Sequence, residues 1–149
     1  MSEEEKKFLE IVDLKKGFGS GETRQEVLRG MNFSVAKGEF CVLLGPSGSG
    51  KSTVANCVMN LCKPDSGEIL YKEIDTCRSK EFRKNKKMLQ TTRQMIFQDS
   101  ASSLNQKMKV SDIITEPMRI QHITPPRGSF VKEAAFQMEY VCLLYTSPS

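Results

Sequence analysis

A glycine-rich segment at residues 45–52, with the sequence GPSGSGKS, constrains the fold of this chain more than any other feature. It matches the pattern G-x-x-x-x-G-K-[ST] at every fixed position, between an apolar run and a helical pattern. Glycines let such a backbone curl so that its N–H groups point at phosphate oxygens, where a Cβ would obstruct the approach. A helix beginning at about Gly50 adds its positive dipole end. The segment therefore predicts a strand, a phosphate-binding loop and a helix in that order, rather than a purely structural glycine turn.

The side chains of this loop indicate which phosphate compound it binds. The Lys51 ammonium suits the β- and γ-phosphates of a nucleoside triphosphate, and the Ser52 hydroxyl is placed to ligate the Mg²⁺ that bridges them. We therefore expect ATP and Mg²⁺ as ligands, with Lys51 also acting in catalysis. The expected binding residues are Gly45, Pro46, Ser47, Gly48, Ser49, Gly50, Lys51, Ser52 and Thr53.

The hydrophobic pattern alternates between strand and helix periods, which is typical of the α/β class. The run at 39–44 is apolar after Glu39, as expected of a strand buried on both faces. Pro117 is expected to break a helix that starts at Ser111. The other predicted strands are 8–14, 27–36, 68–71 and 94–97, and the other predicted helices are 52–61, 79–89 and 130–144.

Composition and charge limit the other functions open to the chain. Much of the net charge of +4 comes from a basic segment at 78–93, which we interpret as a solvated helix face, since no aromatic residue interleaves with it between Phe82 and Phe97. We therefore expect no nucleic-acid partner. No apolar run approaches a membrane span, and the polar N-terminus argues against a signal peptide and for a cytoplasmic location. The five cysteines are expected to be reduced and mostly buried.

Residues around the loop point to a family. The segments 28–30 (LRG), 33–35 (FSV) and 37–40 (KGEF) before the loop, and 63–69 (KPDSGEI) after it, are similar to the ATP-binding subunit of ABC transporters. The resemblance implies a P-loop NTPase fold of the ABC ATPase type, with an N-terminal antiparallel β subdomain joined to the P-loop core. The turn at 19–23 resembles exporter-type members.

A second group of motifs resembles one branch of that family, the oligopeptide and dipeptide importer ATPases. These are 93–99 (RQMIFQD), 103–105 (SLN) and 110–117 (VSDIITEP). The resemblance implies that Gln98 is the Q-loop glutamine, which senses the γ-phosphate through Mg²⁺ and the attacking water; otherwise it is a polar residue at a strand end. The resemblance to the wider family implies that Phe18 stacks on adenine, although an ordinary turn aromatic remains an equal interpretation.

The resemblance further implies partners and a location. A second ATP-binding subunit would dimerise with this one, and transmembrane permease subunits would meet the loop at 99–109. The subunit would then lie peripherally on the inner face of the cell membrane. It would couple ATP binding and hydrolysis to transport, with peptides as candidate solutes and the direction open between the importer-like and exporter-like motifs.

The sequence lacks several motifs of the family. It contains no LSGGQ-like signature, and no apolar strand ends in an aspartate followed by a catalytic glutamate. We therefore expect residues 1–141 to be the N-terminal part of the domain, truncated within the helical subdomain, and residues 142–149 to be a non-native tail. Hydrolysis by this chain alone should be very poor. The alternatives are a nucleotide-binding interaction module that never hydrolyses, or another P-loop enzyme with a basic lid at 80–87.

Overall fold

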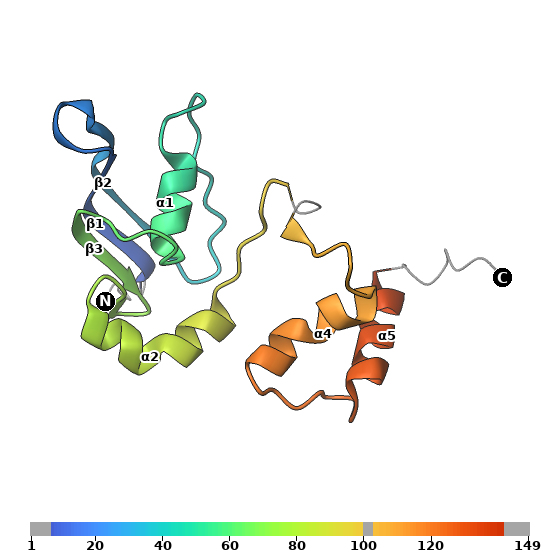
Figure 1. The fold of residues 1–149 in the computed structure, drawn as a ribbon. Coiled ribbons are helices and arrows are strands. Elements are labelled where there is room, and N and C mark those ends of the chain that lie inside the picture. The colour runs from blue at the N-terminus through green and yellow to red at the C-terminus, as the bar shows by residue number, and fades with distance from the viewer. Residues whose placement is uncertain (1–6, 100–102, 142–149) are drawn as a thin grey trace. The chain divides into compact units, whose positions relative to one another are not determined.

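The computed structural model describes residues 7–99 and 103–141, and the chain divides into two compact units between Met95 and Ile96 (Figure 1). The first unit contains β1 (Lys7–Phe18), a 3-10 turn (Gly21–Thr23), β2 (Gln25–Ala36), α1 (Lys51–Val58), β3 (Ser66–Tyr71), β4 (Ile74–Asp75) and α2 (Ser79–Thr92). The second contains α4 (Val110–Ile120) and α5 (Phe130–Tyr140). Each unit is described by itself.

The first unit is built on an antiparallel sheet of order β2-β1-β3-β4. β1 is paired along both edges: Ile11 lies opposite Phe33 of β2 and opposite Ile69 of β3. The register with β2 shifts between Ile11 and Leu14, where Asp13 has a left-handed φ of 45°. The predicted antiparallel β subdomain is thus confirmed, with longer first strands than the alternation alone indicated.

The core of this unit lies between the sheet and α1. Apolar positions of β1, β2 and β3 meet the inward side of the helix, and the buried cluster consists of Ile11, Leu14, Leu28, Val54, Cys57 and Ile69. Ile11, Leu14 and Ile69 are at most 1% exposed. Each such side chain contributes about 1.5–3 kcal/mol on burial. This packing fixes α1, and with it the end of the phosphate-binding loop, against the sheet.

The turn after α1 is pressed against the backbone of β1. Gly67 has a φ of +96°, and a Cβ there would lie 2.4 Å from the carbonyl oxygen of Asp13. Just before it, the Asp65 N–H donates to the Lys15 carbonyl at 2.9 Å. Only a residue without a Cβ allows this approach, which explains the glycine at the second position of β3.

The second unit is a pair of helices, and a buried acid ties the loop between them to α5. Glu133 of α5 is 2% exposed and accepts hydrogen bonds from Arg127 Nη1 at 3.0 Å and Gln137 Nε2 at 2.9 Å. These contacts lower the pKa of the Glu133 carboxyl, the Gln137 hydrogen bond having the largest effect. Ser129 caps α5 by accepting from the Lys132 N–H at 3.2 Å.

Four sequence-based expectations about elements and burial are wrong. The segments 39–44 and 94–97 are irregular rather than strands, and Phe40 and Ile96 are 90% and 92% exposed. A strand forms only where a neighbour pairs with its backbone, and the described residues supply none for these two segments. Pro117 lies inside α4 without breaking it, because regular hydrogen bonding resumes with the Gln121 N–H donating to the Pro117 carbonyl at 3.1 Å. Cys41 is exposed, because it belongs to the first of these segments.

The remaining expectations are closer to the structure. α2 continues to Thr92, and α5 ends at Tyr140, before the predicted boundary at 144. The proposed tail at 142–149 lies outside the described residues. Among the described cysteines, Cys57 is buried, Cys62 and Cys77 are half-buried, and all are free thiols. No helix in the described part of the chain is long and apolar enough to span a membrane.

Replacement of Gly67 tests how closely the turn approaches β1. Gly67→Ala should lower the free energy of unfolding by more than the roughly 1–2 kcal/mol that a left-handed residue costs, because its Cβ also meets the Asp13 carbonyl. Gly38→Ala is the matched control: Gly38 has a φ of +84°, and a Cβ there meets no atom within 4 Å. Urea unfolding followed by circular dichroism measures both losses. Equal losses for the two variants would contradict the close approach.

Candidate nucleotide-binding site

The glycine-rich loop ends in the first turn of α1. Gly50 precedes the helix with a left-handed φ of 89°, and its carbonyl accepts from the Val54 N–H at 2.9 Å. Within the loop, the Ser49 N–H donates to the Pro46 carbonyl at 3.2 Å, and Gly48 is also left-handed. The loop therefore delivers the chain directly to a helix N-terminus, where unpaired N–H groups and the helix dipole favour an anion.

Gly50 also lies tightly against the sheet. A Cβ at this position would stand 2.8 Å from Leu28 Cδ2 and 3.1 Å from Val27 Cγ1, both on β2. Within the loop, a Cβ at Gly45 would stand 2.7 Å from the Ser49 hydroxyl oxygen. The two outer glycines of the motif therefore serve packing as well as backbone freedom.

Lys51 turns its ammonium back into the loop. Its Nζ donates to the Gly45 carbonyl at 2.7 Å, the Pro46 carbonyl at 2.8 Å and the Ser49 hydroxyl at 3.2 Å. All three acceptors are neutral. The positive charge is thus positioned inside the curve of the loop, beside the start of α1.

Phe18 lies on a different element, at the end of β1. Phe18 is 49% exposed, and the Lys16 ammonium stands 5.4 Å from the ring centroid. Phe18 pairs with Gln25 at the start of β2, so the short loop between the two strands is closed immediately beyond it. The ring is accessible to a flat partner.

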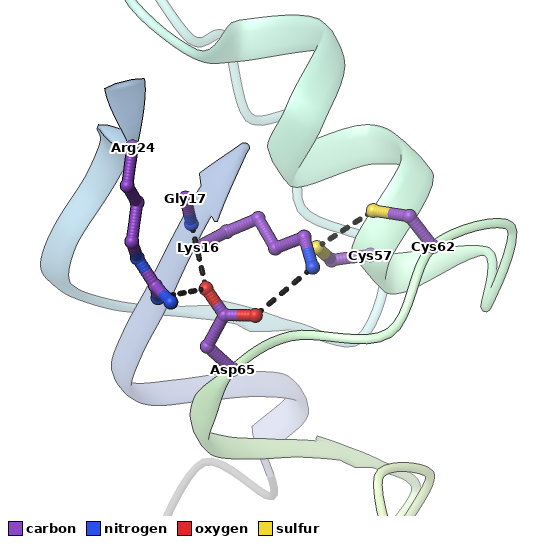
Figure 2. Close-up of polar contacts among 6 residues, drawn as sticks. All are labelled: Lys16, Gly17, Arg24, Cys57, Cys62 and Asp65. Carbon is purple, nitrogen blue, oxygen red and sulfur yellow. Dashed lines mark hydrogen bonds and ion pairs between the residues drawn. The ribbon is translucent and has the colours of Figure 1, made fainter. Parts of the chain in front are cut away.

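One carboxylate joins both ends of the loop beyond Phe18 to the turn after α1 (Figure 2). Asp65 Oδ1 accepts from Lys16 Nζ at 3.0 Å, and Oδ2 accepts from the Gly17 N–H at 2.7 Å and from Arg24 Nη2 at 2.8 Å. The Gly17 N–H, followed by the Lys16 ammonium, lowers the pKa of the Asp65 carboxyl. We refer to these four residues as the Asp65 clamp.

Two thiols lie beside the clamp, near the end of α1. Cys57 Sγ is 3.2 Å from Cys62 Sγ (Figure 2). Burial, together with the contact with Cys62, raises the pKa of the Cys57 thiol to about 12. Cys57 therefore remains a protonated core side chain at neutral pH.

Gln98 lies in the second unit, in an irregular stretch, and is exposed. The first unit thus holds residues 45–53 together in one loop and helix start, holds Phe18 on another strand, and does not contain Gln98. Arg93 is the first residue of the predicted Q-loop motif at 93–99. It belongs to the first unit, where its Nη1 donates to the Val58 carbonyl at 2.5 Å. Sequence reasoning did not identify three residues of the clamp, Asp65, Lys16 and Arg24. The sequence feature that could have indicated Asp65 is the KPDSGE turn at 63–68.

A profile of the ABC transporter family matches residues 28–142. The chain belongs to the ABC transporter family. Curated relatives include the oligopeptide transport ATP-binding protein OppF of Streptococcus pyogenes, 40% identical over 112 residues that cover 74% of this chain and 36% of the relative. The lipoprotein-releasing system ATP-binding protein LolD of Geobacter metallireducens is 49% identical over 70 residues, which cover 47% of this chain and 31% of the relative. The chain therefore spans about a third of the length of the curated relatives it matches.

Solved structures confirm the predicted fold class. The dimeric post-hydrolysis state of the ATP-binding cassette MJ0796, bound to ADP and Pi, matches with a TM-score of 0.70 and 25% identity, covering 88% of this chain and 56% of that one. A second dimeric structure of MJ0796 matches with a TM-score of 0.64 and 27% identity, covering 76% and 47%. The chain is an ABC ATPase-type P-loop unit, in a family that binds ATP.

The lowered pKa of Asp65 predicts how the clamp responds to acid. A carboxyl with a folded pKa below its ordinary 3.8 stabilises the fold fully above that value and loses this contribution as the pH falls through the lower folded pKa. Wild type should therefore unfold at a higher denaturant concentration than Asp65→Asn at pH 7. The difference between their unfolding midpoints should shrink once the pH falls below about 4.

The control variant is Asp13→Asn, which removes an exposed carboxylate 3.0 Å from Lys15 on the same strand. Denaturant titrations at several pH values compare the three proteins. A gap between wild type and Asp65→Asn that is constant with pH would show that the carboxylate charge does not act through the clamp.

Proposed function

We propose that this chain binds ATP with Mg²⁺ through residues 45–53 and Phe18, as the front part of the ATP-binding subunit of a peptide-transporting ABC system. The observation that carries the proposal is the position of the Lys51 ammonium inside a loop that opens onto the N-terminus of α1. A cation, a helix N-terminus and a glycine-rich backbone then act on the same anion.

The triphosphate would bind by replacing the present partners of Lys51. These are two carbonyls and a hydroxyl, all uncharged. Hydrogen bonds between an ammonium and an ionised oxygen are shorter and roughly twice as strong as those between neutral groups. The exchange therefore favours the β- and γ-phosphates, and the freed loop carbonyls can turn outward as the N–H groups turn in.

Mg²⁺ would be held by the Ser52 hydroxyl on the first turn of α1, and the importer-like motif at 93–99 implies Gln98 as a further ligand. Hydroxyl and amide oxygens suit this hard cation, which usually keeps several waters and takes its other ligands from the phosphates. The ion would neutralise charge between the β- and γ-phosphates. Gln98 would report the presence of the γ-phosphate to the segment at 99–109, as the importer-like motif implies.

The base would rest on Phe18. Phe18 is about half exposed, and the Lys16 ammonium lies near its ring. An adenine ring covers an aromatic face well and is tolerant of modest shifts. The site would thus have two parts: a charged one at α1 and a flat one at the end of β1.

The assignment to peptide transport is supported by the relatives matched over most of the chain. OppF of Streptococcus pyogenes and AmiF of Streptococcus pneumoniae, each covering 74% of this chain, are named as oligopeptide transport ATP-binding proteins. We infer that the whole subunit pairs with a second ATP-binding subunit, as the MJ0796 cassette does in its dimeric structures. We also infer that it docks on transmembrane permease subunits at the inner face of the membrane.

Replacement of Lys51 tests the phosphate-binding role. Lys51→Ala should weaken binding of a fluorescent ATP analogue with Mg²⁺ by about tenfold or more, because it removes a charge-assisted contact with the triphosphate. Fluorescence titration of the 149-residue chain measures the affinity, and phosphate release is recorded in parallel. We expect binding without appreciable release, since the signature and catalytic glutamate motifs are absent from the sequence.

The matched control is Lys37→Ala, which removes an exposed lysine from the turn after β2. It should bind as wild type does. Equal affinity of wild type and Lys51→Ala would overturn the proposed site.

Replacement of Ser52 separates the metal from the phosphates. Ser52→Ala should lose most of the increase in ATP affinity that Mg²⁺ produces, because the variant lacks the hydroxyl ligand. In the presence of EDTA, the variant and wild type should bind alike. A variant that still responds to Mg²⁺ as wild type does would place the metal on other groups.

A further inference from the structure

We propose that Asp65 is a positioning residue for base recognition, which holds the loop around Phe18 in register with the phosphate-binding helix. The proposal rests on the proposed function, because it assigns to Asp65 the geometry of the ATP site described above. Asp65 itself need not touch the nucleotide.

The Asp65 carboxylate bonds to residues that are distant from it in the sequence. Asp65 lies 48 residues from Gly17 and 41 from Arg24 along the chain, yet it bonds to both. Gly17 immediately precedes Phe18 at the end of β1, and Arg24 immediately precedes β2. One side chain therefore closes the base of the loop from both sides (Figure 2).

The backbone of Asp65 is itself held against β1. Its own N–H donates to the Lys15 carbonyl at 2.9 Å, and it lies in the segment between α1 and β3. Gly67, two residues on, is pressed against β1 at Asp13. The clamp is thus joined to α1, which begins at the phosphate-binding loop, through the short segment 59–64.

Lys16 connects the Asp65 carboxylate to the Phe18 ring. Lys16 Nζ both pairs with Asp65 Oδ1 at 3.0 Å and stands 5.4 Å from the Phe18 centroid. The Lys16 side chain is only 16% exposed, so its direction is restricted. If the carboxylate is lost, the lysine, the Gly17 N–H and Arg24 each lose a charged partner at once. Phe18 then loses the contacts that set its orientation.

The test compares a ligand that has a base with one that lacks it. Asp65→Asn keeps the size of the side chain and one acceptor, so the fold should survive. Its affinity for ATP should fall about 5–20-fold, the scale of losing one base–aromatic stack. Its affinity for inorganic tripolyphosphate should stay within about twofold of wild type, because the phosphate-binding loop is untouched. A merely structural role would lower both affinities together or neither, and either outcome would overturn the proposal.

Two further variants sharpen the comparison. Asp13→Asn removes an aspartate–lysine pair from the same strand, and Asn tolerates the left-handed φ of 45° there, so both affinities should match those of wild type. Phe18→Ala should lower ATP affinity as Asp65→Asn does, and the double variant should be no weaker than Phe18→Ala alone. Additive losses in the double variant would overturn the proposal, because Asp65 would then act independently of the ring.

A readout without nucleotide separates this inference from the proposed function. The chain contains no tryptophan, so Phe18→Trp places a single tryptophan at the end of β1. Adding Asp65→Asn to it should increase the local motion of Trp seen in time-resolved anisotropy, whereas adding Asp13→Asn should not. Unchanged anisotropy would overturn the clamp even if ATP binds. Failure of the wild-type chain to bind ATP, with the anisotropy change present, would instead refute the proposed function and leave only a structural clamp.

Discussion

The double pairing of β1 is the constraint on which the rest of the first unit depends. β2 follows β1 closely in sequence, but β3 reaches the other edge only after the phosphate-binding loop and α1 have been traversed. Closing the pair between Ile11 and Ile69 therefore returns the chain across the sheet and brings α1 onto the buried side chains of β1. The loop is positioned as a consequence, since Gly50 then lies against Val27 and Leu28. Strand pairing, rather than any property of the loop alone, thus sets where the phosphates would bind.

Features that depend on near neighbours could be predicted from the sequence. The loop at 45–52 carries its own backbone requirements, and the helix after it starts within a residue of the expected position. β1, β2 and β3 each show enough alternation to be found, because one face of each meets the core. The resemblance at 28–40 and 63–69 also led to the family that the profile match confirms.

Features that depend on distant partners could not be predicted in the same way. The runs at 39–44 and 94–97 have a strand-like pattern, but a pattern does not supply the hydrogen-bonding neighbour that a strand requires. Asp65 looks like an ordinary turn aspartate, because its three partners lie 41 to 49 residues away. Pro117 shows the opposite case: the local rule that proline breaks a helix fails here, because the surrounding helix tolerates the missing hydrogen bond.

The inward turn of Lys51 has a consequence for selectivity. Three acceptors of its own loop already occupy the ammonium, so any ligand competes with groups held a few ångströms away at no loss of translational freedom. A neutral nucleoside offers nothing stronger than the carbonyls it would displace. Only a polyanion gains enough from the exchange, and the gain rises with each charged oxygen. The loop's self-contact would therefore disfavour uncharged molecules at this position, whatever base they carry.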